Sequence, residues 1–312
     1  MIIVSDKPGQ LCNQMIIHSN LYLFCKKNKI ILINPSLYNY KGYFREIKIY
    51  PGSKTIFLFF NFLAKIARKL KIKTNLFSAY SIGYDEYCDL DSLPKKSSIF
   101  SHLCLAMGWQ FRTTELIKKN RKEILEIFSP SSFYELQIKN FISQTKTLDS
   151  VLIGVHLRRG DYVRFEGGKY FYDLETYIRI INNLFQLFQN QKIKLLFFSN
   201  EHEFSKIIQN HFQHSVIAPG HELVDLYCLA ECDYIIGPPS TYSLWASYYG
   251  GVPLYLIENP KNNFLKLLKA FKSLNTKLSY NFILGTLFLI NLYIKPTNII
   301  EICILNPYNG CT

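Results

Sequence analysis

The stretch Gly154–Tyr162, which reads GVHLRRGDY, holds the residue types best suited to chemistry. It follows the apolar run Val151–Ile153, so the sequence predicts a buried strand that ends at a polar loop. Open α/β sheets bind ligands at such strand ends. The planar guanidinium forks of Arg158 and Arg159 suit phosphate oxygens. The alternative is a surface arginine pair in which Asp161 neutralises one of the two charges.

A second polar loop lies near the start of the chain. Pro8–Met15 reads PGQLCNQM, follows an expected strand at Ile2–Val4 and feeds an expected helix at Asn13–Lys27. Gly9 permits close approach of the backbone to a ligand, and the start of a helix favours an anion. The alternative is an ordinary strand-to-helix turn.

A third polar loop, Gly237–Ser243, reads GPPSTYS and lies between an expected strand at Cys232–Ile236 and an expected helix at Leu244–Tyr249. The hydroxyls of Ser240 and Thr241, with free backbone N–H groups, form the type of cradle that holds phosphate. The alternative is a plain helix cap.

Composition and element order set the fold class. The chain has 312 residues, 48% hydrophobic and 19% charged, which is enough to bury a core and form two ordinary domains. Strands and helices alternate, which predicts an α/β fold of Rossmann-like units. The polar linker Gln144–Ser150 predicts a boundary between domains 1–149 and 150–312. The tail, about 261–312, includes the apolar run Phe282–Ile294 and is not assigned.

Charge and cysteine usage bear on partners and location. The net charge is +13, but the basic residues are spread along the chain and no nucleic-acid module appears, so a nucleic-acid partner is not expected. The 8 cysteines form no metal-binding pattern, and the start of the chain is not a signal peptide, which predicts reduced thiols in the cytoplasm. Ile56–Lys73 is apolar early and basic late; it reads as a core helix with a solvated face or as a peripheral contact on the inner face of the membrane.

The three loops together resemble a known family. His156–Tyr162 resembles the HxRRxD signature of fucosyltransferases that use GDP-fucose, most closely the bacterial α-1,2-fucosyltransferases of glycosyltransferase family 11. Pro8–Met15 resembles the family's G-x-L-(G)-N-Q-M segment, with Cys12 in place of a glycine. Ser199–Glu201 resembles its FSDD-like stretch with altered acidic positions, and the spacing of Asp225, Asp233 and Ser240–Thr241 resembles its third motif. The resemblance covers roughly residues 1–32 and 151–258.

The resemblance implies a GT-B-like fold, with two Rossmann-like domains facing across a cleft and the N-terminal domain on the acceptor side. The implied reaction is inverting transfer of L-fucose from GDP-β-L-fucose to the 2-hydroxyl of a galactose-type residue of a glycan, in surface polysaccharide synthesis. GDP-fucose and a glycan acceptor are then the partners. No DxD-like motif is evident, so the enzyme is expected to need no metal or other cofactor.

The resemblance also implies roles for particular residues. Arg158 is the phosphate clamp, and Arg159 supports it or holds a neighbouring carboxylate. Glu166 is the expected catalytic base, with Asp161 as its competitor; alternatively Asp161 is a structural partner of Arg159 and Glu166 only caps a loop. The remaining substrate-binding residues are His156 and Asp225, which read the guanine, Ser240 and Thr241, which hold phosphate, and Gly9, Asn13, Gln14 and Tyr242.

Two other functions stay open on sequence alone. A carbohydrate- or nucleotide-binding protein that kept the fold and lost turnover would explain Cys12 and the altered Ser199–Glu201 stretch. A fucosyltransferase with a different acceptor, such as a protein hydroxyl, would keep the chemistry, although the absence of a secretion signal argues against it.

Overall fold

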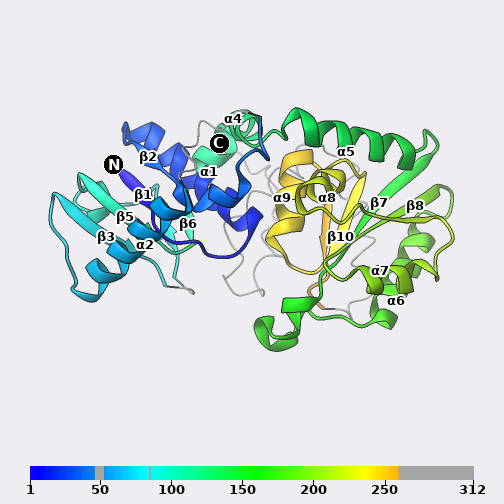
Figure 1. Cartoon of the computed structure of the whole chain (residues 1–312). Helices are drawn as coiled ribbons and strands as arrows, with labels where there is room; N and C mark the ends of the chain where they lie inside the picture. The colour runs from blue at the N-terminus through cyan, green and yellow to red at the C-terminus, as the bar shows by residue number, and fades with distance from the viewer. Residues whose placement is uncertain (46–52, 84–85, 260–312) are drawn as a thin grey trace, which may run out of the picture.

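A computed structural model describes residues 1–45, 53–83 and 86–259 of the chain. The predicted apolar run Phe282–Ile294 and the rest of the tail lie outside these residues. Two parallel sheets organise the described chain, one in each half (Figure 1).

The N-terminal sheet has the strand order β2-β1-β5-β3 and is parallel throughout. Helix α1 covers one face, because its apolar residues cluster with Ile2 and Val4 of β1. Helix α2 covers the other face, where Ala64 packs against Ile3 and Leu105. The elements are β1 (Ile2–Val4), α1 (Leu11–Asn28), β2 (Leu32–Ile33), a 3₁₀ turn at Pro35–Tyr40, α2 (Lys54–Lys69), β3 (Phe77–Ser81) and β5 (Leu103–Met107).

Shorter elements connect this sheet to the second half. Strands β4 and β6 form a two-stranded parallel sheet, and helices α3 and α4 follow it. Their bounds are β4 (Cys88–Asp89), a 3₁₀ turn at Ser98–Phe100, β6 (Phe111–Arg112), α3 (Thr114–Lys119) and α4 (Arg121–Ile127).

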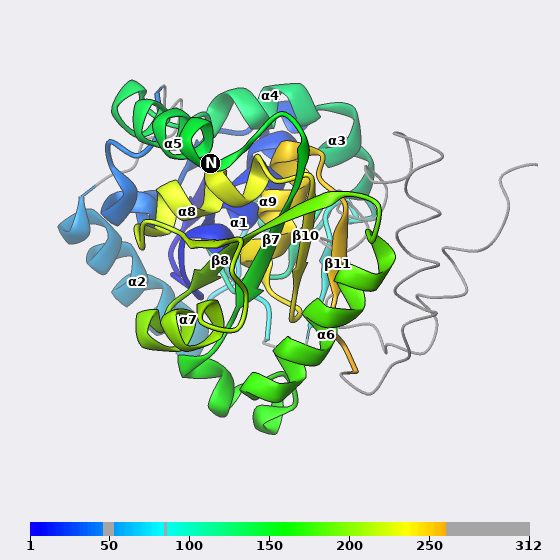
Figure 2. The same cartoon turned by 90° about the vertical axis from the view of Figure 1, so that its right-hand side faces the viewer.

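The C-terminal sheet has the order β11-β10-β7-β8-β9, again all parallel. Alternate residues of β7 enter opposite layers: Ile153 and Val155 pack with α6 and α7, whereas Leu152 packs with α8 and α9. Figure 2 shows the helices on both sides of the sheet. The elements are β7 (Ser150–Leu157), α6 (Leu174–Leu187), β8 (Lys192–Ser199), α7 (His202–Gln209), β9 (Ser215–Ile217), α8 (Glu222–Ala230), β10 (Tyr234–Gly237), α9 (Thr241–Gly250) and β11 (Leu254–Leu256).

Helix α5 (Ser132–Thr145) precedes the predicted boundary at 149/150 but lies along the second half of the molecule (Figure 1). It packs against α8. Just beyond it, Lys146 Nζ forms a 2.7 Å ion pair with Asp233 Oδ1. Packing therefore groups α5 with the second sheet, although chain order places it in the first predicted domain.

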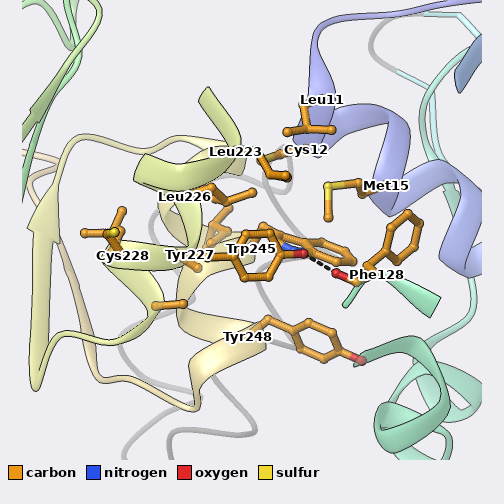
Figure 3. Close-up of a cluster of buried hydrophobic side chains, with 14 of the residues drawn as sticks. Leu11, Cys12, Met15, Phe128, Leu223, Leu226, Tyr227, Cys228, Trp245 and Tyr248 are labelled. Carbon is orange, nitrogen blue, oxygen red and sulfur yellow. Dashed lines mark hydrogen bonds between the residues drawn. The ribbon is translucent and has the colours of Figure 1, made fainter. Parts of the chain in front are cut away.

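One buried cluster spans both halves (Figure 3). Met15 of α1 and Phe128 lie against Trp245, and the Phe128 and Trp245 rings meet edge-on at 5.2 Å. The Tyr227 hydroxyl donates a hydrogen bond to the Phe128 carbonyl oxygen. Arg121 Nη2 donates to the carbonyl oxygens of Tyr248 and Tyr249, both at 2.8 Å, near the end of α9. This apolar contact fixes how the loops of the two halves face each other.

Candidate active site

A cavity of about 370 Å³ lies where loops of the two halves meet. The N-terminal half contributes the turn before α1 and the first residues of that helix. The C-terminal half contributes the ends of β7 and β8 and the first residues of α8 and α9. The lining residues are Gly9, Gln10, Leu11, Cys12, Asn13, His156, Arg158, Asp161, Phe198, Ser199, Asn200, Gly220, Glu222, Asp225, Ser240, Thr241 and Tyr242.

The starts of α1, α8 and α9 all line this cavity. No described side chain caps the start of α1, whereas His221 caps α8 and Ser240 caps α9. The first turns of α1 and α9 carry no acidic residue. Because helix N-termini present backbone N–H groups and the positive end of the helix dipole, the starts of α1 and α9 suit an anionic ligand. The first turn of α8 instead brings the carboxyl groups of Glu222 and Asp225 to the cavity.

Arg158 brings a guanidinium to the cavity, where it is paired with the carboxylate of Asp161. It follows β7 directly, and its Nη2 donates a 2.8 Å hydrogen bond to Asp161 Oδ2. Its Nε is buried and has no partner among the described residues. The guanidinium also lies over the Tyr162 ring, 5.2 Å from the centroid. A buried donor without a partner is costly, and an acceptor on a ligand bound beside Arg158 would remove that cost.

Arg159 does not line the cavity, because its side chain is held elsewhere. Its Nε donates to Glu201 Oε2 at 2.8 Å, and its Nη1 donates to the Tyr172 carbonyl oxygen at 3.0 Å. The guanidinium lies over the rings of Phe171 and Phe204. Of the two predicted roles, the structure shows Arg159 holding a neighbouring carboxylate.

The Gly160 turn explains how Glu201 reaches this arginine. Gly160 has a φ of +59°, and a Cβ there would lie 2.5 Å from Asn200 Nδ2, so only glycine fits without strain. Glu201 Oε1 then accepts from the Gly160 N–H at 2.8 Å. The hydrogen bond from Arg159, aided by the one from Gly160, lowers the pKa of Glu201. Glu201, in the loop after β8, thus holds the loop after β7 in place through two hydrogen bonds.

Of the two residues predicted as the catalytic base, Asp161 lines the cavity and Glu166 does not. Asp161 lines the cavity and pairs with Arg158, so it is not the partner of Arg159 that one alternative proposed. Glu166 is exposed and does not line the cavity. It lies in a 3₁₀ turn, Phe165–Gly168, with a φ of +50°. The carboxyl groups that line the cavity are those of Asp161, Glu222 and Asp225.

His156 is a neutral, buried residue of the cavity wall. Its Nδ1 lies 2.7 Å from Ser243 Oγ, and its ring packs against Tyr242 with centroids 5.2 Å apart. Burial, together with the charge of Arg158, lowers the pKa of His156 to about 3. The imidazole can therefore donate from one nitrogen and accept at the other, as base recognition requires.

Asp225 is a cavity carboxylate that is only 6% exposed. Its Oδ1 accepts a 3.0 Å hydrogen bond from the Gly220 N–H. Burial raises the pKa of Asp225 to about 7, although backbone hydrogen bonds from Gly220 and His221 oppose the shift. A ligand that donates hydrogen bonds to this carboxylate would favour its ionised form.

Gly9 and Asn13 both line the cavity, and the Asn13 side chain packs directly against Gly9. Gly9 has a φ of +69°, and a Cβ there would lie 1.9 Å from Asn13 Nδ2. Asn13 Oδ1 is buried without a partner among the described residues. Gln14 is fully buried and does not line the cavity. Its Nε2 donates to the Pro8 carbonyl oxygen and its Oε1 accepts from Ser36 Oγ, both at 2.7 Å, so it holds the loop that carries Gly9.

Ser240, Thr241 and Tyr242 form the opposite wall. Ser240 caps α9 by accepting from the Tyr242 N–H at 3.2 Å, and the helix begins at Thr241 rather than at the predicted Leu244. Thr241 is the first helical residue, so its N–H and hydroxyl are at the helix start. The Tyr242 hydroxyl donates to the Glu222 carbonyl oxygen at 3.0 Å.

Glu222 is the main cavity residue that the sequence did not single out. It begins α8, is exposed at the cavity, and its Oε1 accepts a 2.9 Å hydrogen bond from the Tyr43 hydroxyl of the N-terminal half. Spacing within the third motif could have drawn attention to it, since it lies one turn before Asp225. Within residues 1–45, 53–83 and 86–259, no group of three or more His, Cys, Asp or Glu side chains is arranged to hold a metal ion.

The fold is shared with solved fucosyltransferase structures. An Arabidopsis thaliana FUT1 mutant in complex with GDP is 12% identical and aligns over 84% of this chain and 72% of its own, with a TM-score of 0.57. Fucosyltransferase NodZ from Bradyrhizobium is 13% identical over 82% of this chain and 96% of its own, also at 0.57. NodZ α-1,6-fucosyltransferase co-crystallised with GDP is 12% identical over 84% and 96%, at 0.55. These likenesses, with the two parallel sheets, confirm the predicted GT-B-like α/β fold.

Sequence comparison identifies the family directly. Curated proteins provide no match to the sequence. The profile of glycosyl transferase family 11, in contrast, matches residues 6–276, which include the cavity loops of both halves. The chain belongs to glycosyl transferase family 11.

Proposed function

We propose that the protein is an inverting fucosyltransferase that moves L-fucose from GDP-β-L-fucose to a glycan, with the 2-hydroxyl of a galactose-type residue as acceptor. The observation that carries the proposal is the unpartnered Nε of Arg158 beside the starts of α1, α8 and α9. Family membership supports glycosyl transfer, and the GDP complexes of FUT1 and NodZ suggest the nucleotide to test.

In this proposal the pyrophosphate of the donor binds between Arg158 and the start of α9. As the bond from the fucose anomeric carbon to the β-phosphate oxygen breaks, negative charge grows on that phosphate. A fixed guanidinium and helix N–H groups stabilise this charge without reorganising. Ser240 and Thr241 hold phosphate oxygens in this arrangement, and no step requires a metal.

The guanine is assigned to the Asp225 side of the cavity. A carboxylate can accept two hydrogen bonds, one from the guanine N1–H and one from its exocyclic amino group. His156, which is neutral, supplies a further hydrogen-bonding edge. Asp225 is buried, so replacing its ionised form by a neutral side chain leaves one of the two guanine donors without an acceptor.

The acceptor hydroxyl must lose its proton as it attacks the anomeric carbon from the face opposite GDP. Asp161 is engaged by Arg158, and Asp225 is buried. Glu222 is exposed at the cavity and faces Tyr43 of the N-terminal half, the proposed acceptor side. We therefore assign Glu222 as the general base in place of Glu166, which does not line the cavity.

The test is turnover of GDP-fucose with a panel of galactose-terminated and other glycans, with GDP-mannose and UDP-galactose as donor controls. Expected are GDP release that depends on GDP-fucose and acceptor, and a product whose NMR spectrum shows an α-fucosyl unit on the galactose 2-oxygen. Tight GDP-fucose binding without transfer to any acceptor would instead indicate a binding protein. Transfer to another hydroxyl would overturn the assigned linkage alone.

A further inference from the structure

Helix α2 exposes large apolar side chains on the face turned away from the first sheet. Phe57, Ala64 and Ala67 form its buried side. At helical spacings of one to four residues, the opposite side carries side chains that are 38% to 64% exposed. We call this the α2 face; it consists of Leu58, Phe59, Phe62, Ile66 and Leu70. Figure 2 shows α2 on the outside of the molecule.

An apolar surface of this kind is unusual on a helix that also has a buried side. A helix on the surface of a globular protein ordinarily presents charged or polar residues to solvent. Here two phenylalanines, Phe59 at 57% and Phe62 at 62% exposure, point outward instead. Contiguous exposed apolar surface marks an interaction site.

The charged side chains of α2 and of the segment that follows it, up to residue 83, all have one sign. The sequence from Ser53 to Gly83 contains no aspartate or glutamate. Lys65 and Lys69 lie on the helix beside the apolar side chains and are exposed. Further exposed basic residues are Lys54, Arg68, Lys71 and Lys73. Residues 53–83 therefore combine exposed apolar side chains with cations and contain no acidic residue that would offset them.

We propose that the α2 face binds the surface of a membrane that contains anionic lipids. Apolar side chains enter the boundary between headgroups and acyl chains, and the lysines contact the negative headgroups. A second copy of this chain fits less well, because a symmetric contact would bring the same cations together. None of the described helices is long and apolar enough to cross a membrane.

The bound lipid surface would lie near the N-terminal side of the cavity. Asn61, on α2, donates a 2.7 Å hydrogen bond from Nδ2 to the Ser5 carbonyl oxygen. Ser5 directly follows β1, and the chain then runs through Pro8 to the cavity residue Gly9. Docking through α2 would thus fix the orientation of the acceptor side relative to the membrane.

The test is co-sedimentation of the full chain with vesicles of phosphatidylcholine, alone or mixed with phosphatidylglycerol. The wild type should pellet with the mixed vesicles and be released by high salt. Phe59→Ser with Phe62→Ser should weaken binding by at least about tenfold, because each side chain loses its burial in lipid. Lys65→Gln with Lys69→Gln should weaken it on the order of tenfold on mixed vesicles only.

The control is a matched pair of exposed apolar residues elsewhere. Phe133 and Leu136 on α5 are 68% and 60% exposed, so Phe133→Ser with Leu136→Ser should leave vesicle binding unchanged. Retained GDP binding and an unchanged thermal melt show that each variant is folded. The proposal is overturned if the wild type stays in the supernatant or if the α2 and α5 variants pellet alike. It is also overturned if sedimentation velocity without lipid shows a dimer that the α2 variant loses.

Discussion

Arg159 Nε donates a 2.8 Å hydrogen bond to Glu201 Oε2, and this contact separates the roles of two adjacent arginines. Arg159 is held between aromatic rings and the Tyr172 carbonyl oxygen, outside the cavity. Arg158 lines the cavity and retains a buried Nε without a partner in the described chain. One arginine therefore maintains the loop, and the other is available to a ligand.

Because Arg159 contacts the loop and not the cavity, Arg159→Ala should reduce activity by destabilising the folded protein. Loss of its hydrogen bonds should lower the free energy of unfolding by about 1–3 kcal/mol, as for charge-assisted hydrogen bonds in other proteins. Glu201→Gln should have a smaller effect, and a double-mutant cycle should show coupling between the two. Arg164→Ala, an exposed arginine in the same loop, is the control and should melt like the wild type. An Arg159→Ala variant with wild-type stability and strongly reduced turnover would contradict the structural role.

The raised pKa of Asp225 predicts that GDP binding depends on pH. With a pKa of about 7, the carboxyl group is ionised above pH 7 and protonated below it. Guanine donates to the ionised form, so GDP affinity should be highest above pH 7 and fall by up to about tenfold per pH unit below it. Calorimetry between pH 5.5 and 8.5, a range of about three units around the midpoint, measures this.

Asp225→Asn is the control for that measurement. It should bind GDP more weakly and without the step near pH 7, while titration of the GDP phosphates is common to both proteins and cancels in their ratio. Inosine diphosphate lacks the exocyclic amino group, so it should bind the wild type more weakly than GDP. If Asp225→Asn binds GDP with unchanged affinity, Asp225 does not read the guanine.

The cavity geometry predicts which carboxylate accepts the acceptor proton. Glu222→Gln should keep the hydrogen bond from Tyr43 and lower kcat by about 10²–10⁴, the usual contribution of general base catalysis. GDP affinity should change little. Glu166→Gln and Tyr43→Phe should each stay within about tenfold of the wild type, since neither removes a cavity carboxylate. Loss of turnover in Glu166→Gln, with Glu222→Gln active, would restore Glu166 as the base.

Turnover should not require a divalent metal, because Arg158 and the helix starts supply the positive potential at the phosphates. Initial rates with GDP-fucose should be the same in EDTA and in Mg²⁺ or Mn²⁺. An activity that EDTA abolishes and either ion restores would show that the metal-independent mechanism is wrong.

Local sequence patterns predicted the elements around the cavity more accurately than the rest of the fold. The expected strand at Ile2–Val4 and the expected strand that begins near Val151 are present as β1 and β7. In contrast, β3 and β5 lie in the region for which no strand was predicted. Both are short, and β5 is buried between β1 and β3, so neither shows a long alternating pattern.

Prediction of the site residues was limited in the same way, because local sequence does not show long-range contacts. The types and spacing of Arg158, Asp225 and Ser240 led to the cavity, because strand ends of a parallel sheet converge. The contact between Arg159 and Glu201 joins residues that are 42 positions apart, and its geometry depends on the loops after β7 and β8. Glu222 became a candidate only when packing of the two halves brought Tyr43 to it. Such long-range contacts leave no pattern in the local sequence.

The most direct test of the central claim is kcat for Arg158→Ala, measured with GDP-fucose and a productive acceptor. If Arg158 stabilises charge on the leaving β-phosphate, kcat should fall by at least about 10²–10³, with a smaller loss of GDP affinity. Arg158→Lys should recover little, because the ammonium lacks the planar fork. Thermal melts must show that both variants are folded. A folded Arg158→Ala enzyme within about tenfold of the wild-type kcat would contradict the account, since removing the clamp would then not affect the transition state.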